Sequence, residues 1–271
     1  MNPNRYLPDT NRISVLTAMV LLAFALTRLL ETTAYLVAFQ IFGLVIRFDI
    51  DLRIIIIVLA AGLTATGMDW LLKSHPHIGK KKRTLDHWLV PMLTALVLGM
   101  PLYLLRMNLL WWLGFAFGGF LLVLVFWAEY VVVSPGDVNY PTAMVVITVL
   151  SFALYLILAM VLRYSAARLF FLLPMTFVAT FLVSLRALNL RLGGRWEIPW
   201  ALGVAFVGVQ LAAGLHYLPI TPIYYGVILL GVLYGLTTLV ASLLEGIPLR
   251  RALTEPGIML FALLVLGVWL N

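Results

Sequence analysis

The chain has 271 residues, of which 63% are hydrophobic and only 11% charged, with no cysteine and a formal net charge of +7. A soluble domain carries about 25% charged residues, so this composition excludes an ordinary soluble protein and makes lipid the expected solvent. The missing cysteines exclude disulfides, thiolate metal sites and cysteine nucleophiles. The basic residues lie in short loops between apolar runs, which is typical of topology signals and argues against a nucleic-acid partner.

We predict an all-α protein, a polytopic transmembrane helical bundle that forms a single membrane domain over residues 1–271. A helical crossing needs about 20 apolar residues, and turn signals such as Ser134-Pro-Gly136 and Gly193-Gly194 separate the apolar runs. The expected spans, about nine in number, are roughly 13–31, 53–72, 87–105, 109–133, 142–162, 169–188, 198–217, 222–244 and 256–270.

The segment after the first span has a different period. Ile46-Arg-Phe-Asp-Ile-Asp51 alternates apolar and charged residues, which is the period of a strand. With Phe42-Gly43 as the turn, we expect a β-hairpin over residues 34–51. An open hairpin leaves unpaired edge groups that lipid cannot satisfy, so it belongs at the membrane surface. The alternative is an additional helical span.

The distribution of basic residues predicts the orientation. With the N-terminus in the cytoplasm, 12 of the 18 Lys and Arg residues lie on the inner side, as the positive-inside rule requires. An odd number of spans then places the C-terminus outside. We expect a cell membrane as the location.

Ionisable residues fall near the ends of the predicted spans. Charges at the centre of a bilayer mark ion pathways and proton relays, so their absence there argues against transport coupled to ions. Gln210, about 16 Å into its span, is the main polar side chain expected at mid-depth. An interhelical hydrogen bond and a solute ligand are both open roles for it.

Three acidic or basic side chains are candidates for a site. Arg28 and Glu31 are neighbours on one helix face at the outer side and are expected to pair. Glu129, in Trp127-Ala-Glu-Tyr130, is the acid expected to be buried, which requires a partner. Arg186 and Arg191, also predicted on the inner side, are the candidate partners.

The inner loop between residues 73 and 83 is the most charged stretch. Lys80, Lys81, Lys82 and Arg83 are candidates for binding anionic lipid headgroups, or act only as a topology signal. His75 and His77 are weak metal candidates, together with Asp69, Asp86, His87, Glu129 and Asp137 on the same side. Their spacing matches no zinc motif, and we predict neither a metal nor a cofactor.

Two further sequence features bear on the class of protein, namely the enzyme motifs that are missing and the spacing of glycines. The sequence has no nucleophile elbow and no Walker loop. Gly114-xxx-Gly118 and Gly231-xxx-Gly235 indicate close helix packing, either within the bundle or against other membrane proteins.

Four short motifs carry a resemblance to a family: Arg28-Leu-Leu-Glu31, Ser74-His-Pro76, His87-Trp88 and Ala128-Glu-Tyr130. They resemble those of an uncharacterised family of bacterial multi-pass membrane proteins of unknown function. The resemblance implies a fold and no activity.

These observations favour a non-enzymatic bacterial membrane protein. It would act as a scaffold or partner subunit, using its small-residue helix faces, or as a permease for a neutral or lipid-like solute. The alternative is an interfacial enzyme acting on a lipid headgroup, with Glu129, Glu31 and Arg28 as its candidate catalytic residues.

Overall fold

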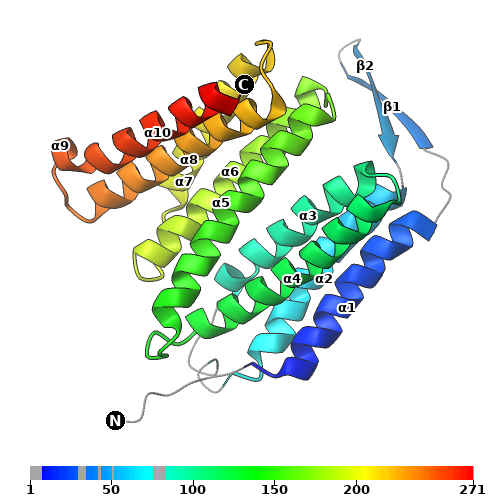
Figure 1. Ribbon diagram of the computed structural model, residues 1–271, viewed down its shortest axis with the longest axis horizontal. Coiled ribbons are helices and arrows are strands. Elements are labelled where there is room, and N and C mark those ends of the chain that lie inside the picture. The colour runs from blue at the N-terminus through cyan, green and yellow to red at the C-terminus, as the bar shows by residue number, and fades with distance from the viewer. Residues whose placement is uncertain are drawn as a thin grey trace. The chain divides into compact units, whose positions relative to one another are not determined.

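The computed structural model describes residues 8–29, 35–41, 44–50, 52–75, 78 and 84–270. It consists of long helices and one pair of strands (Figure 1). The elements are α1 (Thr10–Leu29), β1 (Tyr35–Ile41), β2 (Leu44–Ile50), α2 (Leu52–Leu72), the 3-10 helix η2 (Leu85–His87), α3 (Leu89–Leu104), α4 (Leu109–Val132), α5 (Tyr140–Tyr164), α6 (Leu169–Arg191), α7 (Ile198–His216), α8 (Pro222–Leu244), α9 (Leu249–Ala252) and α10 (Thr254–Leu270).

All nine predicted spans are helices, with bounds close to those expected. Among the described residues, eight helices are long and apolar enough to cross a membrane, and the helical segment from residue 85 to 104 is counted among them. The ninth, α10, has 17 residues. At 1.5 Å per residue α10 extends about 26 Å, which is shorter than a hydrocarbon core of about 30 Å.

The strands β1 and β2 pair antiparallel, with Tyr35 opposite Ile50 and Ile41 opposite Leu44. They connect α1 to α2 in the chain order. A position of this segment at a membrane surface stays a prediction.

The described part of the chain divides into two compact units, which we call the N-terminal unit (residues 8–133) and the C-terminal unit (residues 134–270). In the N-terminal unit, α1 packs on α2 and α4, and α3 packs on α2 and α4. In the C-terminal unit, α5 packs on α6 and α8, and α7 packs on α6 and α8. The first four long helices of each unit therefore follow the same packing order, and α10 is added against α8.

An arginine stabilises the third helix in each unit. Arg28, the penultimate residue of α1, donates to the carbonyls of Leu102 (2.6 Å), Tyr103 (3.2 Å) and Leu105 at the end of α3. Arg163, the penultimate residue of α5, donates to the carbonyls at the end of α7, those of His216 (2.8 Å) and Leu218 (2.7 Å). The last carbonyls of a helix have no partner within the helix and attract positive charge. Both arginines therefore act as C-terminal caps.

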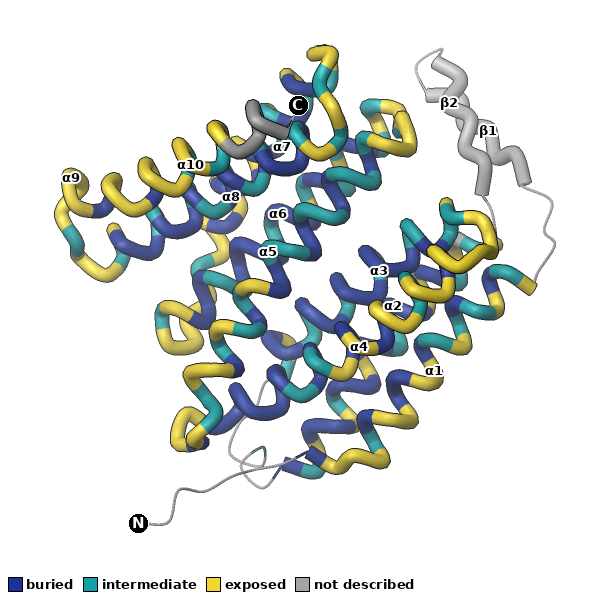
Figure 2. Tube along the Cα trace, in the orientation of Figure 1, coloured by how far each residue is buried: buried dark blue, intermediate teal, exposed yellow. Residues whose placement is uncertain are grey.

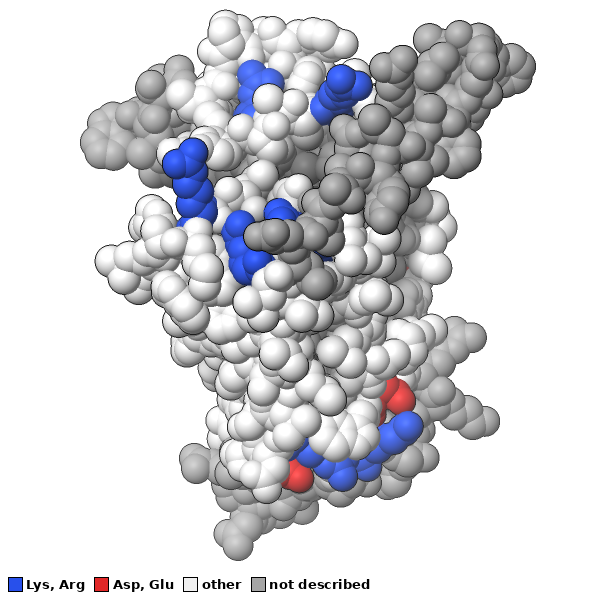
Figure 3. All heavy atoms as spheres, turned by 90° about the vertical axis from the view of Figure 1, so that its right-hand side faces the viewer, with Lys and Arg blue, Asp and Glu red and all other residues white. Residues whose placement is uncertain are grey.

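The outer faces of the helices are apolar. On α1, four residues at helical spacing are 42–67% exposed, namely Val15, Met19, Leu22 and Leu26. Exposed positions also run along α4 and α10 (Figure 2). Water does not tolerate apolar patches of this extent on a monomer, whereas lipid does. Figure 3 shows that uncharged side chains predominate on the face that it draws.

The glycine pairs are used within the units. A Cβ on Gly231 would lie 3.1 Å from the Leu260 side chain of α10, and one on Gly118 would lie 3.5 Å from Leu98 of α3. These small-residue faces therefore hold neighbouring helices of the same unit.

Candidate functional site

The N-terminal unit gathers its buried ionisable groups at one end. The end of α2, the helix η2 and the end of α4 meet there, because neighbouring helices run in opposite directions. His87 is 1% exposed and its Nδ1 lies 2.7 Å from Oε2 of Glu129, which is 0% exposed. The other ring nitrogen, Nε2, lies 3.7 Å from Oδ2 of Asp86. We call these three residues the imidazole–carboxylate cluster.

Other polar groups surround this cluster at the same end. The His75 ring is buried and meets the Tyr130 ring edge to face, with 4.7 Å between centroids. Asp69 accepts a hydrogen bond of 2.8 Å from Thr84 and lies 3.4 Å from Lys73 Nζ. Asp69 and Lys73 are partly exposed, unlike His87 and Glu129.

A buried carboxylate with an imidazole can hold or transfer a proton, which is acid–base chemistry. Such chemistry on a lipid headgroup requires contact with the headgroup, and both His87 and Glu129 are enclosed by protein. A buried carboxylate–imidazole hydrogen bond also fixes the helices that carry its two members, because removing either one takes a partner away from a buried polar group. The described geometry fits this second role.

Among the residues that the structure describes, no group of three His, Cys, Asp or Glu side chains is placed to hold a metal ion. His77 lies outside those residues, as do Glu31 and the lipid-headgroup candidates Lys80, Lys81, Lys82 and Arg83.

Contacts are described for the three predicted arginines, whereas Glu31, the expected partner of Arg28, lies outside the described residues. Arg28 contacts carbonyls of α3, as described above. Arg191 pairs with Glu245 (Nε to Oε1, 2.8 Å) and Arg186 donates to Asn189 (3.0 Å). Gln210 is exposed on α7. The contact between His87 and Glu129 was not predicted from the sequence, although both residues belong to the same predicted side.

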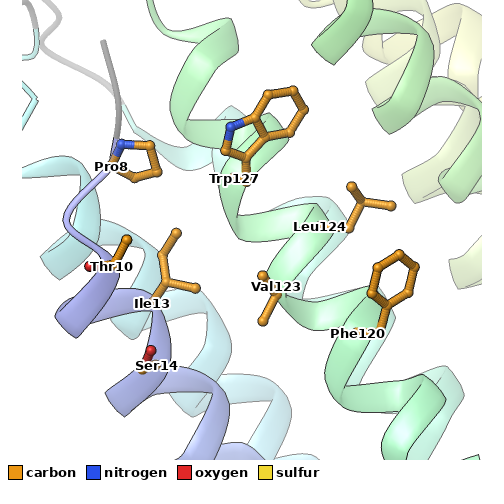
Figure 4. Close-up of a pocket in the computed structure, with 8 residues that line it drawn as sticks. All are labelled: Pro8, Thr10, Ile13, Ser14, Phe120, Val123, Leu124 and Trp127. Atoms are coloured by element: carbon orange, nitrogen blue, oxygen red, sulfur yellow. The ribbon is translucent and has the colours of Figure 1, made fainter.

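Each unit also contains a hollow between its first and fourth helices. In the N-terminal unit, a groove of about 370 Å³ lies between α1 and α4 (Figure 4). Its walls are mainly apolar, with Ile13 on one side and Phe120, Val123 and Trp127 on the other. Such a groove offers few polar groups to orient a ligand.

The C-terminal unit has a pocket of about 480 Å³ between α5, α6 and α8, which we call the α5/α6/α8 pocket. Its volume lies in the range of about 300–1,000 Å³ found for small-molecule sites. It is lined by Met144, Val145, Thr148, Val149, Phe152, Ala187, Leu190, Arg191, Tyr234, Thr237, Thr238 and Ala241.

Two polar side chains, Tyr234 and Arg191, lie among the mainly apolar residues that line this pocket. Tyr234 donates a hydrogen bond of 2.9 Å to Glu255, and its ring lies edge to face on Phe152 at 5.5 Å. Arg191 makes two bonds to Glu245, of 2.8 and 3.0 Å, and one of 3.1 Å to Ser242 Oγ. An apolar pocket with a few converging polar groups is the usual form of a ligand site. Its residues carry no sequence motif, which is why sequence analysis missed it.

The bundle of long apolar helices with lipid-compatible outer faces defines a multi-pass helical membrane protein. The chain belongs to DUF5656, a family described as proteins of unknown function, which matches residues 32–270. The match agrees with the resemblance to an uncharacterised family. No curated protein and no solved structure matches the chain significantly.

Proposed function

We propose that this protein is a non-enzymatic permease of a bacterial cell membrane that binds a lipid-like solute in its α5/α6/α8 pocket. Its N-terminus would lie in the cytoplasm and its C-terminus outside. The observation that carries the proposal is the pocket itself, which combines an apolar wall with a polar rim inside one unit.

The position of the pocket along its helices supports this reading. On α5 it extends from Met144 to Phe152, which is about 12 Å at 1.5 Å per residue. Arg191 is the last residue of α6, and it marks the end of the pocket at which α6 ends. A ligand with a polar head and an apolar tail fits this distribution, with its head near Arg191.

The repeated packing order of the two units is a second support. Many transporters consist of internal repeats, including parallel repeats related by an axis along the membrane normal. The helix α5 is the fourth span after α1, and an even number of crossings would give the two repeats the same orientation in the membrane. The partner-subunit reading has less support, because both glycine pairs already hold helices of their own units.

The test is purification in native lipid followed by mass spectrometry of the molecules that stay bound. Ala187→Phe fills the pocket from α6, and Val149→Trp covers it from a position that is 59% exposed. The matched control is Val178→Phe, an exposed site on α6 outside the pocket. We expect one enriched lipid-like molecule in the wild type and in the control.

Loss of that molecule in both pocket variants, at unchanged folded yield, would support the proposal. An equal set of bound lipids in all four proteins would contradict it. Co-purification of a stoichiometric protein subunit instead would favour the scaffold reading.

A further inference from the structure

The α5/α6/α8 pocket contains a polar group that the protein itself does not satisfy. Thr237 lines the pocket and is 4% exposed, and its hydroxyl has no hydrogen-bond partner among the described residues. A buried hydroxyl without a partner costs roughly 1–3 kcal/mol. Most buried polar groups in native structures have a partner, so an unsatisfied one requires an explanation, of which a bound molecule is one.

Several other threonine hydroxyls are satisfied within their own helices, whereas Thr17 Oγ1 on α1 is, like that of Thr237, buried without a partner among the described residues. Thr148, on the opposite wall, donates to the carbonyl of Met144 at 2.8 Å, four residues earlier in its own helix. Thr176 and Thr180 lie four residues apart on α6, and Thr180 donates to the Thr176 carbonyl at 2.7 Å. A threonine in a helix normally has this option. The Thr237 oxygen is itself enclosed by protein atoms, and a rotation about the Cα–Cβ bond turns it toward the cavity.

The charges of the pocket restrict the head of the ligand. Of the residues that line it, only Arg191 is charged, and its guanidinium is already bonded to both carboxylate oxygens of Glu245. Tyr234 directs its hydroxyl to Glu255, a second acid at this rim. A phosphate head would meet two carboxylates and one neutralised guanidinium, so its desolvation would go largely uncompensated.

We infer that the α5/α6/α8 pocket selects a single-chain lipid with an uncharged head bearing hydroxyl or carbonyl groups, and that Thr237 hydrogen-bonds to that head. This inference rests on the proposed function and specifies its ligand. The ligand class shares the chemistry of monoacylglycerols and long-chain alcohols.

The experiment compares two probes with the same chain, monooleoylglycerol and oleoyl lysophosphatidate, on the full-length protein in detergent by native mass spectrometry. We expect the uncharged probe to bind at least tenfold more tightly. Thr237→Val keeps the shape of the side chain and removes the hydroxyl. It should weaken binding of the uncharged probe about fivefold, the value of one neutral hydrogen bond.

The matched control is Thr94→Val in the N-terminal unit, which removes a buried hydroxyl that donates to the Val90 carbonyl at 2.7 Å. It should bind the uncharged probe as the wild type does. Equal binding of both probes, or a Thr237→Val protein indistinguishable from the wild type, would overturn the inference while leaving a lipid site in place. Binding of neither probe, with no lipid enriched from native membrane, would remove the proposed function as well.

Discussion

Removing the carboxylate of Glu129 tests the role of the imidazole–carboxylate cluster. The pair between His87 and Glu129 has a separation of 2.7 Å and exposures of 1% and 0%. Removing one member of such a buried pair costs about 3–5 kcal/mol when the pair is ionised. Glu129→Ala should therefore lower the unfolding temperature by roughly 6–20 °C, at about 2–4 °C per kcal/mol for a protein of this size.

Glu129→Gln should cost less. The amide retains a hydrogen-bonding oxygen near His87 and loses only the charge, which is the difference between a charged and a neutral hydrogen bond, about 1–2 kcal/mol. The measurement is thermal unfolding in detergent, followed by tryptophan fluorescence. A double-mutant cycle with His87→Ala and Glu129→Ala should give a coupling energy above about 1.5 kcal/mol.

The matched control is the pair of Asp69 and Lys73, which is partly exposed, with 3.4 Å between the charged atoms. Its coupling energy should stay below about 1 kcal/mol. A coupling energy of the His87–Glu129 pair no larger than this control would refute the structural role. An enzymatic role would instead appear as loss of an activity in Glu129→Gln at unchanged stability.

Two further predictions concern the arginine caps and the topology. Arg28→Gln should lower the unfolding temperature by several degrees, because about 1–3 kcal/mol of charge-assisted hydrogen bonding to the α3 carbonyls is lost. The control Arg106→Gln, in the adjacent loop, should change the unfolding temperature little. Equal effects of the two substitutions would contradict the capping role. For topology, the chain contains no cysteine, so Lys81→Cys and Leu218→Cys can be labelled without background in intact cells. An impermeant reagent should reach position 218 from outside and not position 81, and the reverse pattern would invert the predicted orientation.

The positions of the helices were predictable because each membrane helix corresponds to one continuous run of apolar residues in the sequence. About 20 consecutive apolar residues give its length, and the break before Pro222 gave the start of α8 at the residue observed. The end of α6 was harder to predict. The helix continues three residues past the predicted end at 188 to Arg191, because a basic residue is favourable in the last turn of a helix.

The contacts between helices were not predictable in the same way. The position of each residue along its predicted span placed His87 and Glu129 on the same side of the membrane. Which side chains meet, however, depends on the rotation of each helix about its own axis. That rotation depends on packing against several neighbours at once. In the same way, the position of Gln210 along its span predicted a polar side chain at mid-depth. The structure shows that this side chain is exposed on α7.

The α5/α6/α8 pocket shows most clearly what could not be predicted from the sequence alone. Thr148 and Thr237 are both threonines within apolar spans, and nothing in their sequence neighbourhood distinguishes them. Thr148 donates a hydrogen bond to the Met144 carbonyl, whereas the Thr237 hydroxyl has no partner among the described residues. Only the three-dimensional arrangement of α5 and α8 places both on the wall of one cavity.

The most direct test of a selective lipid site is photo-crosslinking from within the pocket. p-Benzoylphenylalanine replaces Phe152, which lines the pocket beside Tyr234, or Phe206, which is 59% exposed on α7. After irradiation in native membranes, mass spectrometry identifies the lipids attached at each position. We predict an adduct enriched in one uncharged, single-chain lipid at position 152 and bulk membrane lipids at position 206; the same bulk lipids at both positions would contradict the account.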